Sequence, residues 1–444
     1  MVGISNIGAE AQKVNSVKAE KDRIEKEAFF CTTKELSRLG LEQIPTQFQS
    51  HKHLIYSSPA TLAFNSPGAE GFGVKRAGLA VPDSIMLIVA PGCCGRNTSL
   101  ISSMKEYNDR FYYLMMDETD IVTGRHLKKI PKAVEEICSV CPKKPSVVMI
   151  CITCVDALLG TDMERVCKKA EERVEIPVRP CYMYALTREG RKPPMVHVRQ
   201  SLYSLLEPGK KKGNVVNLLG FFSPLVDDCE IYDLLHSAGV KTIHEISRCK
   251  DYMEYQTMSE ANFNLVLHHE ARFAAEDFHN RLQIPFIELR RLYQIDKIEN
   301  QYHALGNALG VVFCDEKYKK QAEDALEKFR QKCPDASFAI GECLNADPFE
   351  LSLALIRYGF SVPEIYGTIT VENFTYIRSL AKISPETKVF SNMEPTMIYY
   401  DPAKSDVNLA IGKDACYYHP DCPYVMWNGE EQPYGYAGVR RLFE

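Results

Sequence analysis

Short apolar runs alternate with amphipathic segments over the first half of this chain, a pattern typical of strands and helices that follow one another. Apolar runs that predict strands are SIMLIVAP (84–91), FYYLMM (111–116), SVVMICI (146–152) and IPVRPCYM (176–183). Amphipathic helices are predicted between them, over 124–141 and 163–174. Strands that are joined by helices pair in parallel, so this part of the chain predicts an α/β unit with a parallel sheet.

The segment EPGKKKGN (207–214) interrupts this rhythm with proline, glycine and lysines, and it predicts a domain boundary. The alternation begins again after it, and a third series opens at GVVFCD (310–315). We therefore expect α/β architecture with three doubly wound, Rossmann-like domains and parallel sheets. The expected divisions are a helical extension (1–30), a first domain (31–210), a second domain (211–305) and a third domain (306–444).

Length and composition limit the classes of protein that this chain can represent. Its 444 residues suit two or three domains, and a net charge of -5 with a pI near 6.2 argues against nucleic-acid binding. No stretch reaches about 18 uncharged apolar residues, so we expect no membrane span. The charged N-terminus lacks the apolar block of a signal peptide. A cytoplasmic protein with neither nucleic acid nor membrane as a partner is therefore expected.

Cysteine is unusually frequent for a protein with no export signal, because the chain has 16 of them. In a reducing cytoplasm they stay thiols unless a metal binds them, and most are expected to be small core residues. This richness suits an anaerobe that handles iron and sulfur. Cys151 and Cys154 differ from the rest because they lie at the carboxyl end of a predicted buried strand, where α/β proteins place ligands.

A zinc site shared by the Cys138-x-x-Cys141 pair and the second pair, Cys151-x-x-Cys154, is disfavoured. The first pair ends a predicted helix, and the strand that follows it separates the two pairs by roughly 20 Å. Each pair is therefore considered separately.

Another cysteine pair, Cys93 and Cys94, lies in the loop APGCCGRNTS (90–99) after a different predicted strand. One interpretation is a buried thiol next to an exposed one. The other is that Cys94 binds metal together with Cys154, because iron–sulfur clusters take thiolate ligands. Two loops that supply two or three ligands would leave the rest to a partner chain.

Histidines supply further candidates. The run NFNLVLHH ends in His268 and His269, which alternation along a strand turns to opposite faces. Either imidazole can ligate a metal, donate a proton to a reduced substrate, or be a hydrogen-bonded structural residue. Farther along, Cys416, His419 and Cys422 have spacings that allow local metal binding, although a loop of core cysteines explains them equally well.

The segment 180–201 is rich in basic residues. Arg188, Arg191, His197 and Arg199 can hold an anionic substrate or cofactor through charge-assisted hydrogen bonds, or they can lie on a solvated surface. The residue types alone leave both interpretations open.

Several segments resemble, in the same order, those of nitrogenase component 1 and its relatives. CITCVDALLGTDMERVCKK (151–169) is similar to the segment around the family's third cluster cysteine, and APGCCGRNTSL (90–100) to the loop of the second, which aligns with Cys94. Other similar segments are DIVTGRHLKKIPKAVEEI (120–137), NVVNLLG (214–220), NFNLVLHHEARFAAEDFHNRLQIPFIEL (262–289) and EEQPYGYAG (430–438). From about residue 60 to its end, the chain therefore resembles the nitrogenase component 1-like oxidoreductases, which include the nitrogenase molybdenum–iron protein, light-independent protochlorophyllide reductase and the nickel-tetrapyrrole reductive cyclase.

This resemblance implies a three-domain fold around a central cavity and an iron–sulfur cluster shared between subunits. It also implies a separate ATP-hydrolysing iron protein that delivers electrons one at a time. The partner subunit would be homologous, either as a second copy in a homodimer or as the other half of a heterodimer that can occur twice.

The chain departs from the family at several ligand positions. The family's first cluster cysteine falls within residues 64–78, where this sequence has no cysteine. Cys93, Cys31, a residue of the partner or an oxygen ligand can replace it, and the smaller number of ligands favours a [4Fe–4S] cluster over an eight-iron cluster. The first cofactor anchor of molybdenum nitrogenase aligns with His268, whereas the second falls near Val425, where no histidine is found.

The missing anchor implies that the cavity holds a tetrapyrrole, a different metallocofactor or another substrate, or that this subunit bears no cofactor. Arg188, His197 and Arg199 align with a segment that lines the family's cavity, and His419 is a further candidate for cofactor contact. His268 and His269 are the candidates for proton donation to a substrate in this cavity.

Three functions follow from these observations, of which we expect the first, an enzyme, and keep the second as the alternative. The first is a subunit of a nitrogenase-like, ATP-dependent reductase, in which electrons pass from the iron protein through the cluster to a substrate in the cavity. The second is a scaffold on which a metallocluster is built and handed on. The third is a structural protein that binds metal without redox chemistry.

Overall fold

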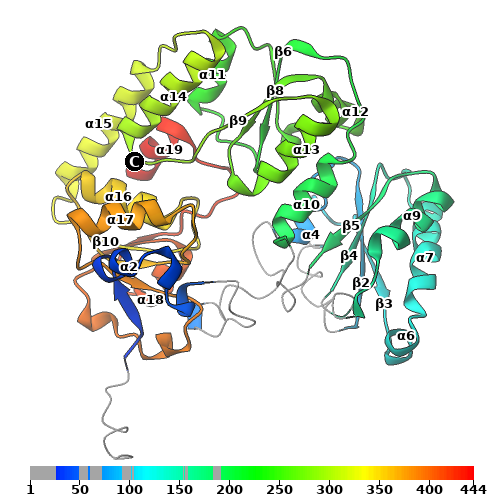
Figure 1. Ribbon diagram of the computed structural model, residues 1–444, viewed down its shortest axis with the longest axis horizontal. Coiled ribbons are helices and arrows are strands. Elements are labelled where there is room, and N and C mark those ends of the chain that lie inside the picture. The colour runs from blue at the N-terminus through cyan, green and yellow to red at the C-terminus, as the bar shows by residue number, and fades with distance from the viewer. Residues whose placement is uncertain are drawn as a thin grey trace, which may run out of the picture.

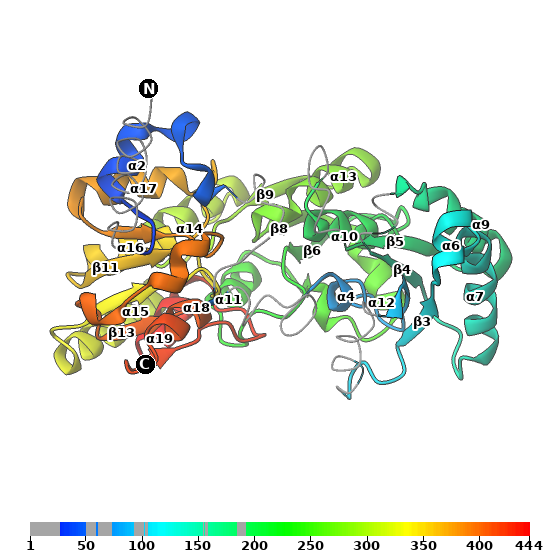
Figure 2. The same ribbon diagram turned by 90° about the horizontal axis from the view of Figure 1, so that it is seen from below.

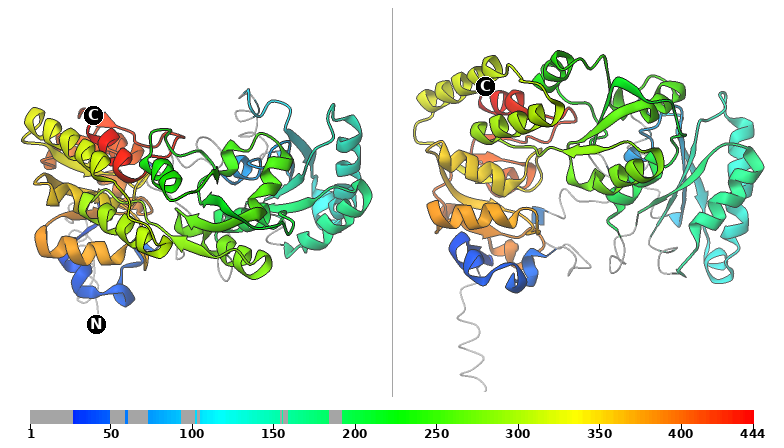
Figure 3. Two further views of the ribbon diagram at one scale, coloured as in Figure 1. Left: turned by 90° about the horizontal axis from the view of Figure 1, so that it is seen from above. Right: turned by 45° about the horizontal axis from the view of Figure 1, so that its top comes forward.

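The protein is described by a computed structural model that covers residues 27–49, 59–60, 73–92, 102, 105–153, 155, 159–183 and 192–444. Three β-sheets with helices packed against them form three domains in an arc, with the first and third at its ends and the second between them (Figure 1). Views from below (Figure 2) and from above (Figure 3) show the same order. The expected α/β class with parallel sheets is confirmed.

The first sheet has the order β3-β2-β4-β5, and all of its strands are parallel. The strands are β2 (Ile85–Ala90), β3 (Phe111–Met115), β4 (Val148–Ile152) and β5 (Val178–Tyr182). The helices are α4 (Val74–Ala77), α6 (Glu118–Thr123), α7 (His126–Val140), α9 (Met163–Val174) and α10 (Pro194–Tyr203). Both β2 and β4 are fully buried because helices cover the two faces, which explains their unbroken apolar sequences.

The second sheet has the order β7-β6-β8-β9 and is also parallel. Its strands are β6 (Lys212–Leu219), β7 (Thr242–His244), β8 (Ala261–Val266) and β9 (Phe286–Glu288). Its helices are α11 (Glu230–Ser237), α12 (Tyr252–Gln256), α13 (Arg272–Leu282) and α14 (Ile295–Leu309). The first and second domains share one core, in which Tyr203 of α10 packs on Phe278 of α13 with ring centroids 5.3 Å apart.

The third sheet has the order β1-β12-β11-β10-β13-β14. Its strands are β1 (Phe30–Thr32), β10 (Ser337–Ile340), β11 (Ser361–Tyr366), β12 (Lys388–Phe390), β13 (Leu409–Ile411) and β14 (Tyr424–Val425). Its helices are α2 (Thr33–Leu39), α15 (Glu316–Lys332), α16 (Pro348–Arg357), α17 (Phe374–Ile383), α18 (Lys413–Tyr418) and α19 (Gly435–Phe443). The segment 311–315, which opens the third series in the sequence, forms no strand.

The N-terminal strand belongs to the third domain in the structure, although the sequence analysis placed it with the first. β1 pairs antiparallel with β12, so that Phe30 lies opposite Phe390. α2 packs beside α17, as Figure 2 shows. Pairing between segments so distant in sequence leaves no local pattern, because the apolar residues of an edge strand look alike whichever sheet they join.

The C-terminal helix α19 returns to pack against α11 and α15. The buried Glu230 carboxylate of α11 accepts backbone hydrogen bonds from Tyr436 at 2.6 Å and Ala437 at 3.0 Å, and so binds the first amides of α19. Gly435 has a φ of +58°, and a Cβ atom there would lie 1.9 Å from Glu230 Oε1. Only glycine therefore lets this carboxylate approach the helix start.

Within the ranges given above, no helix is long and apolar enough to cross a membrane.

Candidate functional site

The carboxyl ends of β2 and β4 lie side by side in the first sheet, because the two strands pair in parallel and Val89 lies opposite Ile152. The segments that carry Cys93, Cys94 and Cys154 follow these two ends directly. The three cysteines themselves lie outside the described residues. Their convergence on one cluster therefore stays a prediction.

Cys31 lies in β1 of the third sheet, opposite Val389, and is 9% exposed. Burial, with the nearby Glu35 carboxylate, raises the pKa of its thiol to about 11. A thiol binds metal as the thiolate, so this environment disfavours ligation. The structure does not bring Cys31 to the sheet that carries the ends of β2 and β4.

Cys151 of β4 and Cys181 of β5 lie opposite each other on neighbouring strands, and both face the core shared by the first two domains. Both thiols are fully buried. Cys141, at the end of α7, lies instead near the Tyr112 hydroxyl, with Sγ and the phenol oxygen 3.1 Å apart. These thiols are thus core or helix-end residues in the structure.

His268 and His269 follow β8 at the junction of the domains. The β6–β8 ladder continues one step past β8, since the amide of Leu267 donates to the carbonyl of Leu219 at 2.8 Å. The next residue of the other strand, Gly220, has a φ of +135°, and a Cβ atom there would lie 2.8 Å from the backbone nitrogen of His268. Glycine at this position lets the two chain segments touch and fixes where the His268 side chain begins.

The His268 ring is partly enclosed, with 32% of its side chain exposed. It stacks on His269 with centroids 4.5 Å apart and meets Phe221 edge-on at 5.7 Å. Its Nδ1 accepts a hydrogen bond from the backbone N–H of Glu270 at 3.3 Å. Burial, together with the charges of Arg199, His269 and Arg291, lowers the pKa of His268 well below its ordinary value. The imidazole is therefore neutral at neutral pH.

Arg199 of α10 connects the first domain to this histidine. Its guanidinium is buried and donates to the carbonyl oxygen of Gly220 from Nε at 2.9 Å and from Nη2 at 2.7 Å. Nη1 donates to the Glu270 carboxylate at 2.7 Å and to the Met195 carbonyl at 2.9 Å. One side chain thus holds the ends of both central strands of the second sheet.

Arg291 is a second cation of the junction, and it follows β9. Its guanidinium lies over the Phe221 ring, 4.4 Å from the centroid, and Nη2 donates to Gln432 Oε1 at 2.5 Å. Its Nε is buried and has no hydrogen-bond partner among the described residues. Since an unsatisfied buried N–H is costly, this atom fits a site that receives an acceptor from elsewhere.

Carboxylates of the third domain lie at the ends of that domain's strands. Glu342 follows β10 and accepts the amide of Thr368 at 2.9 Å, while Asp414 accepts the amide of Glu342 at 2.8 Å and Asn392 Nδ2 at 2.6 Å. Burial, opposed in part by the hydrogen bond from Thr368 and reinforced by the Asp414 carboxylate, raises the pKa of Glu342. The sequence analysis missed Arg291 and Glu342, although both follow strands and the strand-end rule could have identified them.

His197 and His419 do not join His268. His197 lies on α10, edge-on to Tyr182 with ring centroids 4.3 Å apart. Burial, and to a smaller extent the charge of Lys192, lowers its pKa to about 4. His419 is enclosed in the third domain with 2% of its side chain exposed. Arg188 lies outside the described residues. Of the predicted cofactor contacts, the structure thus brings Arg199 alone to the two histidines that follow β8, within its described part.

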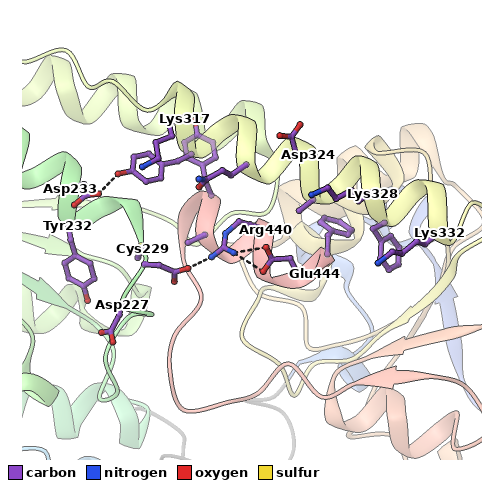
Figure 4. A pocket seen from close by; sticks show the side chains of 18 residues that line it. Asp227, Cys229, Tyr232, Asp233, Lys317, Asp324, Lys328, Lys332, Arg440 and Glu444 are labelled. Carbon is purple, nitrogen blue, oxygen red and sulfur yellow. Dashed lines mark hydrogen bonds and ion pairs between the residues drawn. The ribbon is translucent and has the colours of Figure 1, made fainter.

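A polar pocket of about 640 Å³ lies elsewhere, between α11, α15 and α19 (Figure 4). Its central cation, Arg440, pairs with Asp228 and Glu444, and the Tyr318 hydroxyl donates to Asp233. These charged groups satisfy one another and join the second domain to the third. We therefore place the candidate site at the strand ends around His268 instead.

The donor set at this junction indicates what it can hold. In the part of the chain that the structure describes, no three His, Cys, Asp or Glu side chains are placed to bind one metal ion. The groups present are instead a neutral imidazole, a buried arginine network and the unpartnered Nε of Arg291. Such a site fits an anionic ligand held by hydrogen bonds, which includes a preassembled metal–sulfur cluster with its negatively charged sulfides.

Fold and candidate site together define a class, that of three-domain α/β proteins with a candidate ligand site at a domain junction. The sequence profile of the family described as nitrogenase component 1 type oxidoreductase matches residues 70–419. Because this match covers most of the chain, the protein belongs to that family. The predicted resemblance is thereby confirmed.

Curated relatives agree with this assignment. The nitrogenase iron-molybdenum cofactor biosynthesis protein NifE of Sinorhizobium fredii (strain NBRC 101917 / NGR234) is 25% identical over 87% of this chain and 82% of that protein. NifE of Clostridium pasteurianum is 24% identical over 56% of this chain and 54% of that protein. The solved structure described as nitrogenase Cp1 at pH 6.5 is 18% identical and covers 87% of this chain and 90% of that one, with a TM-score of 0.67, which shows the shared fold.

Proposed function

We propose that this chain is a scaffold subunit that receives a metal–sulfur cluster at the domain junction and passes it to another protein. The observation that carries the proposal is the donor set around His268, which offers hydrogen bonds and positive charge without three converging ligand side chains in the described residues. A cluster bound without many coordinate bonds can leave intact. The relatives whose names describe cofactor biosynthesis support the same role.

The proposal includes a second, resident cluster of the [4Fe–4S] type between this chain and a homologous partner subunit. Cys94 and Cys154 would be its ligands from this chain, with Cys93 as a further candidate. The adjacent carboxyl ends of β2 and β4 support this assignment, because both loops start from neighbouring points. Cys31 is a weaker candidate, since it is buried in the third sheet.

A second candidate function is an ATP-dependent reductase subunit that receives electrons from an iron protein. The same adjacency of β2 and β4 favours it, because a cluster at a subunit surface is well placed to pass electrons inward. In this alternative, His268 or His269 would supply protons to a substrate in the junction. Tetrapyrroles and other anionic substrates would fit the cationic groups there.

Anaerobic purification of the full chain, co-expressed with its partner, separates the candidates. We expect a coloured protein with iron and sulfide, and transfer of cluster metal to a cluster-free acceptor protein. With an iron protein, ATP and reductant, the scaffold should show no repeated turnover. Sustained product formation would favour the reductase instead, and a colourless protein that contains zinc would contradict both.

Alanine substitutions test the resident cluster. Cys154→Ala and Cys94→Ala should each lose most of the interface iron, measured as iron and sulfide per chain and by paramagnetic resonance. Cys151→Ala is the matched control, because its thiol lies three residues earlier but is buried in the core. Full iron in Cys154→Ala would contradict the assignment. Cys93→Ala and Cys31→Ala then identify the remaining ligand.

A further inference from the structure

The hydrogen bonds around His268 distinguish its two ring nitrogens. The backbone N–H of Glu270 donates to Nδ1 at 3.3 Å, so Nδ1 presents a lone pair. A neutral imidazole carries one proton, which must then lie on Nε2. Across the described part of the chain, Nε2 makes no hydrogen bond, and about a third of the side chain is exposed (32%). Nε2 is thus a donor.

Arg199 controls the group that could reverse this arrangement. The Glu270 carboxylate oxygen Oε2 lies 3.7 Å from Nδ1, close to hydrogen-bond range. A free carboxylate there would accept a proton from Nδ1 and leave the lone pair on Nε2, as in the usual carboxylate–histidine–metal arrangement. Instead, Arg199 Nη1 binds the same oxygen at 2.7 Å. The other two guanidinium nitrogens, Nε and Nη2, donate to the Gly220 carbonyl, so the guanidinium cannot move together with the His268 ring.

We propose that Arg199 is a positioning residue that holds His268 in the Nε2–H form, so that this histidine binds its ligand as a hydrogen-bond donor and does not coordinate a metal ion. The inference rests on the proposed function and deepens it by naming the ligand's chemistry. The group that meets the ring carries an acceptor, such as a sulfide or an oxyanion. Arg291, whose positive charge acts on His268, favours an anionic ligand as well.

The tautomer is measured directly by nitrogen NMR of histidine-labelled, metal-free protein at a pH where the ring is neutral. In the wild-type chain, we expect a pyridine-like Nδ1 and a pyrrole-like Nε2. Arg199→Gln frees the Glu270 carboxylate and should shift the population toward Nδ1–H. The double variant Arg199→Gln/Glu270→Ala should restore Nε2–H, because the competing acceptor is then absent.

Arg281→Gln is the matched control for loss of an arginine that bridges the first two domains. Arg281 donates to the carbonyls of Leu206 at 2.5 Å and Tyr203 at 2.9 Å, but it does not contact Glu270. Its loss should leave the His268 tautomer unchanged. If Arg199→Gln fails to fold, Arg199→Lys replaces it, because one ammonium cannot bind both Gly220 and Glu270 in the same way. A wild-type pyrrole-like Nδ1, or a tautomer that ignores Arg199, would overturn the proposal.

Two probes test the ligand chemistry. Tetrathiomolybdate is a coloured dianion with sulfide acceptors, whereas zinc ion requires a lone pair. Gln at position 268 places an amide N–H near Nε2, and Asn places it near Nδ1. We expect His268→Asn to weaken tetrathiomolybdate binding about ten-fold or more and His268→Gln to weaken it clearly less. Equal losses, no binding, or zinc binding that depends on His268 would contradict the proposal.

The two proposals can fail separately. A protein that carries and transfers cluster metal but has Nδ1–H on His268 keeps the scaffold function and loses the inference. A protein with the Nε2–H tautomer that neither holds nor transfers iron keeps the positioning role of Arg199 and loses the scaffold function.

Discussion

Two histidines, His268 after strand β8 of the second domain and His419 at the end of helix α18 of the third, have opposite surroundings. His419 Nε2 lies 3.1 Å from Glu364 Oε2, 2.9 Å from the Tyr400 hydroxyl and 3.3 Å from that of Tyr366, and the side chain is 2% exposed. Among the described residues, His268 has a single hydrogen bond, at Nδ1, and its side chain is 32% exposed.

This difference separates a structural histidine from a candidate functional one. The third-domain ring is enclosed by partners that satisfy it, and aromatic rings stack around them, with Tyr366 and Tyr418 centroids 5.1 Å apart. In the His268 ring, Nε2 has no hydrogen-bond partner within the described part of the chain. The residue type is the same, so the number of partners and the exposure of the ring decide which histidine can meet a ligand.

The largest expected effect is on stability, and it should appear at His419. His419→Ala leaves the buried Glu364 carboxylate without its imidazole partner, which should lower the free energy of unfolding by about 3–5 kcal/mol. His268→Ala should cost about 1 kcal/mol or less, because its ring is partly exposed and weakly bonded.

Urea unfolding followed by fluorescence of Trp427 measures both changes. This residue is the single tryptophan of the chain, and its indole N–H donates to the Tyr293 hydroxyl at 2.7 Å, between the second and third domains. A His419→Ala protein as stable as His268→Ala would remove the distinction between the two histidines.

A smaller effect concerns Glu350, which is buried beneath the connection between the second and third domains. Its carboxylate accepts the amide of Tyr293 at 2.9 Å, and burial raises its pKa from 4.5 to about 7. The folded state therefore binds more protons than the unfolded state between these values. The contribution of Glu350 to the free energy of unfolding should be fully present below about pH 4.5. It should fall by roughly 3 kcal/mol as the pH rises through 7. Glu350→Gln should flatten this part of the pH–stability curve, and an unchanged curve would show that the group titrates normally.

Glu364 should give a pH dependence of the opposite sign in the same domain. Although burial opposes it, hydrogen bonds from His419 and Tyr400 lower the pKa of Glu364 below 4.5. Its contribution to stability is present above the ordinary pKa and is lost as the pH falls through the lowered value. Acid unfolding of Glu364→Gln should begin from a less stable protein but depend less steeply on pH. A steeper acid transition would contradict the lowered pKa.

The smallest effect is expected at an exposed ion pair of the third domain. Lys34 Nζ and Glu386 lie 4.0 Å apart, and both side chains are more than two-thirds exposed (71% and 79%). Lys34→Ala should change the free energy of unfolding by about 0–1 kcal/mol, because water screens the pair. The same urea experiment measures it and sets the baseline for the histidine variants. A loss as large as that of His419→Ala would mean that exposure does not rank these interactions.

Much of the parallel architecture could be predicted from local sequence. The run 146–152 contains β4 (148–152), because a strand buried on both faces needs unbroken apolar residues. The run 262–269 contains most of β8 (261–266), although Asn262 and Asn264 interrupt its apolar residues. Strand ends then located His268 without any structural information. Local pattern also suggested the segment with Arg199, although it left open whether that residue was solvated.

Contacts between distant segments could not be predicted in this way. Phe30 pairs with Phe390, and Glu230 binds the amide of Tyr436, yet neither pair leaves a periodic signal in the sequence. The role of Arg199 also depends on such a contact, since Glu270 lies far along the chain.

By itself, the sequence of this protein determined the alternation of strands and helices, the class of fold, its family and the strand ends where ligands are expected. Those features depend on local periodicity and short motifs, which the chain carries residue by residue. The tertiary structure alone decided which sheet received the N-terminal strand, which histidine was enclosed and which nitrogen of His268 kept its proton. Such outcomes depend on hydrogen-bond partners and burial, which arise only when segments remote in sequence come together.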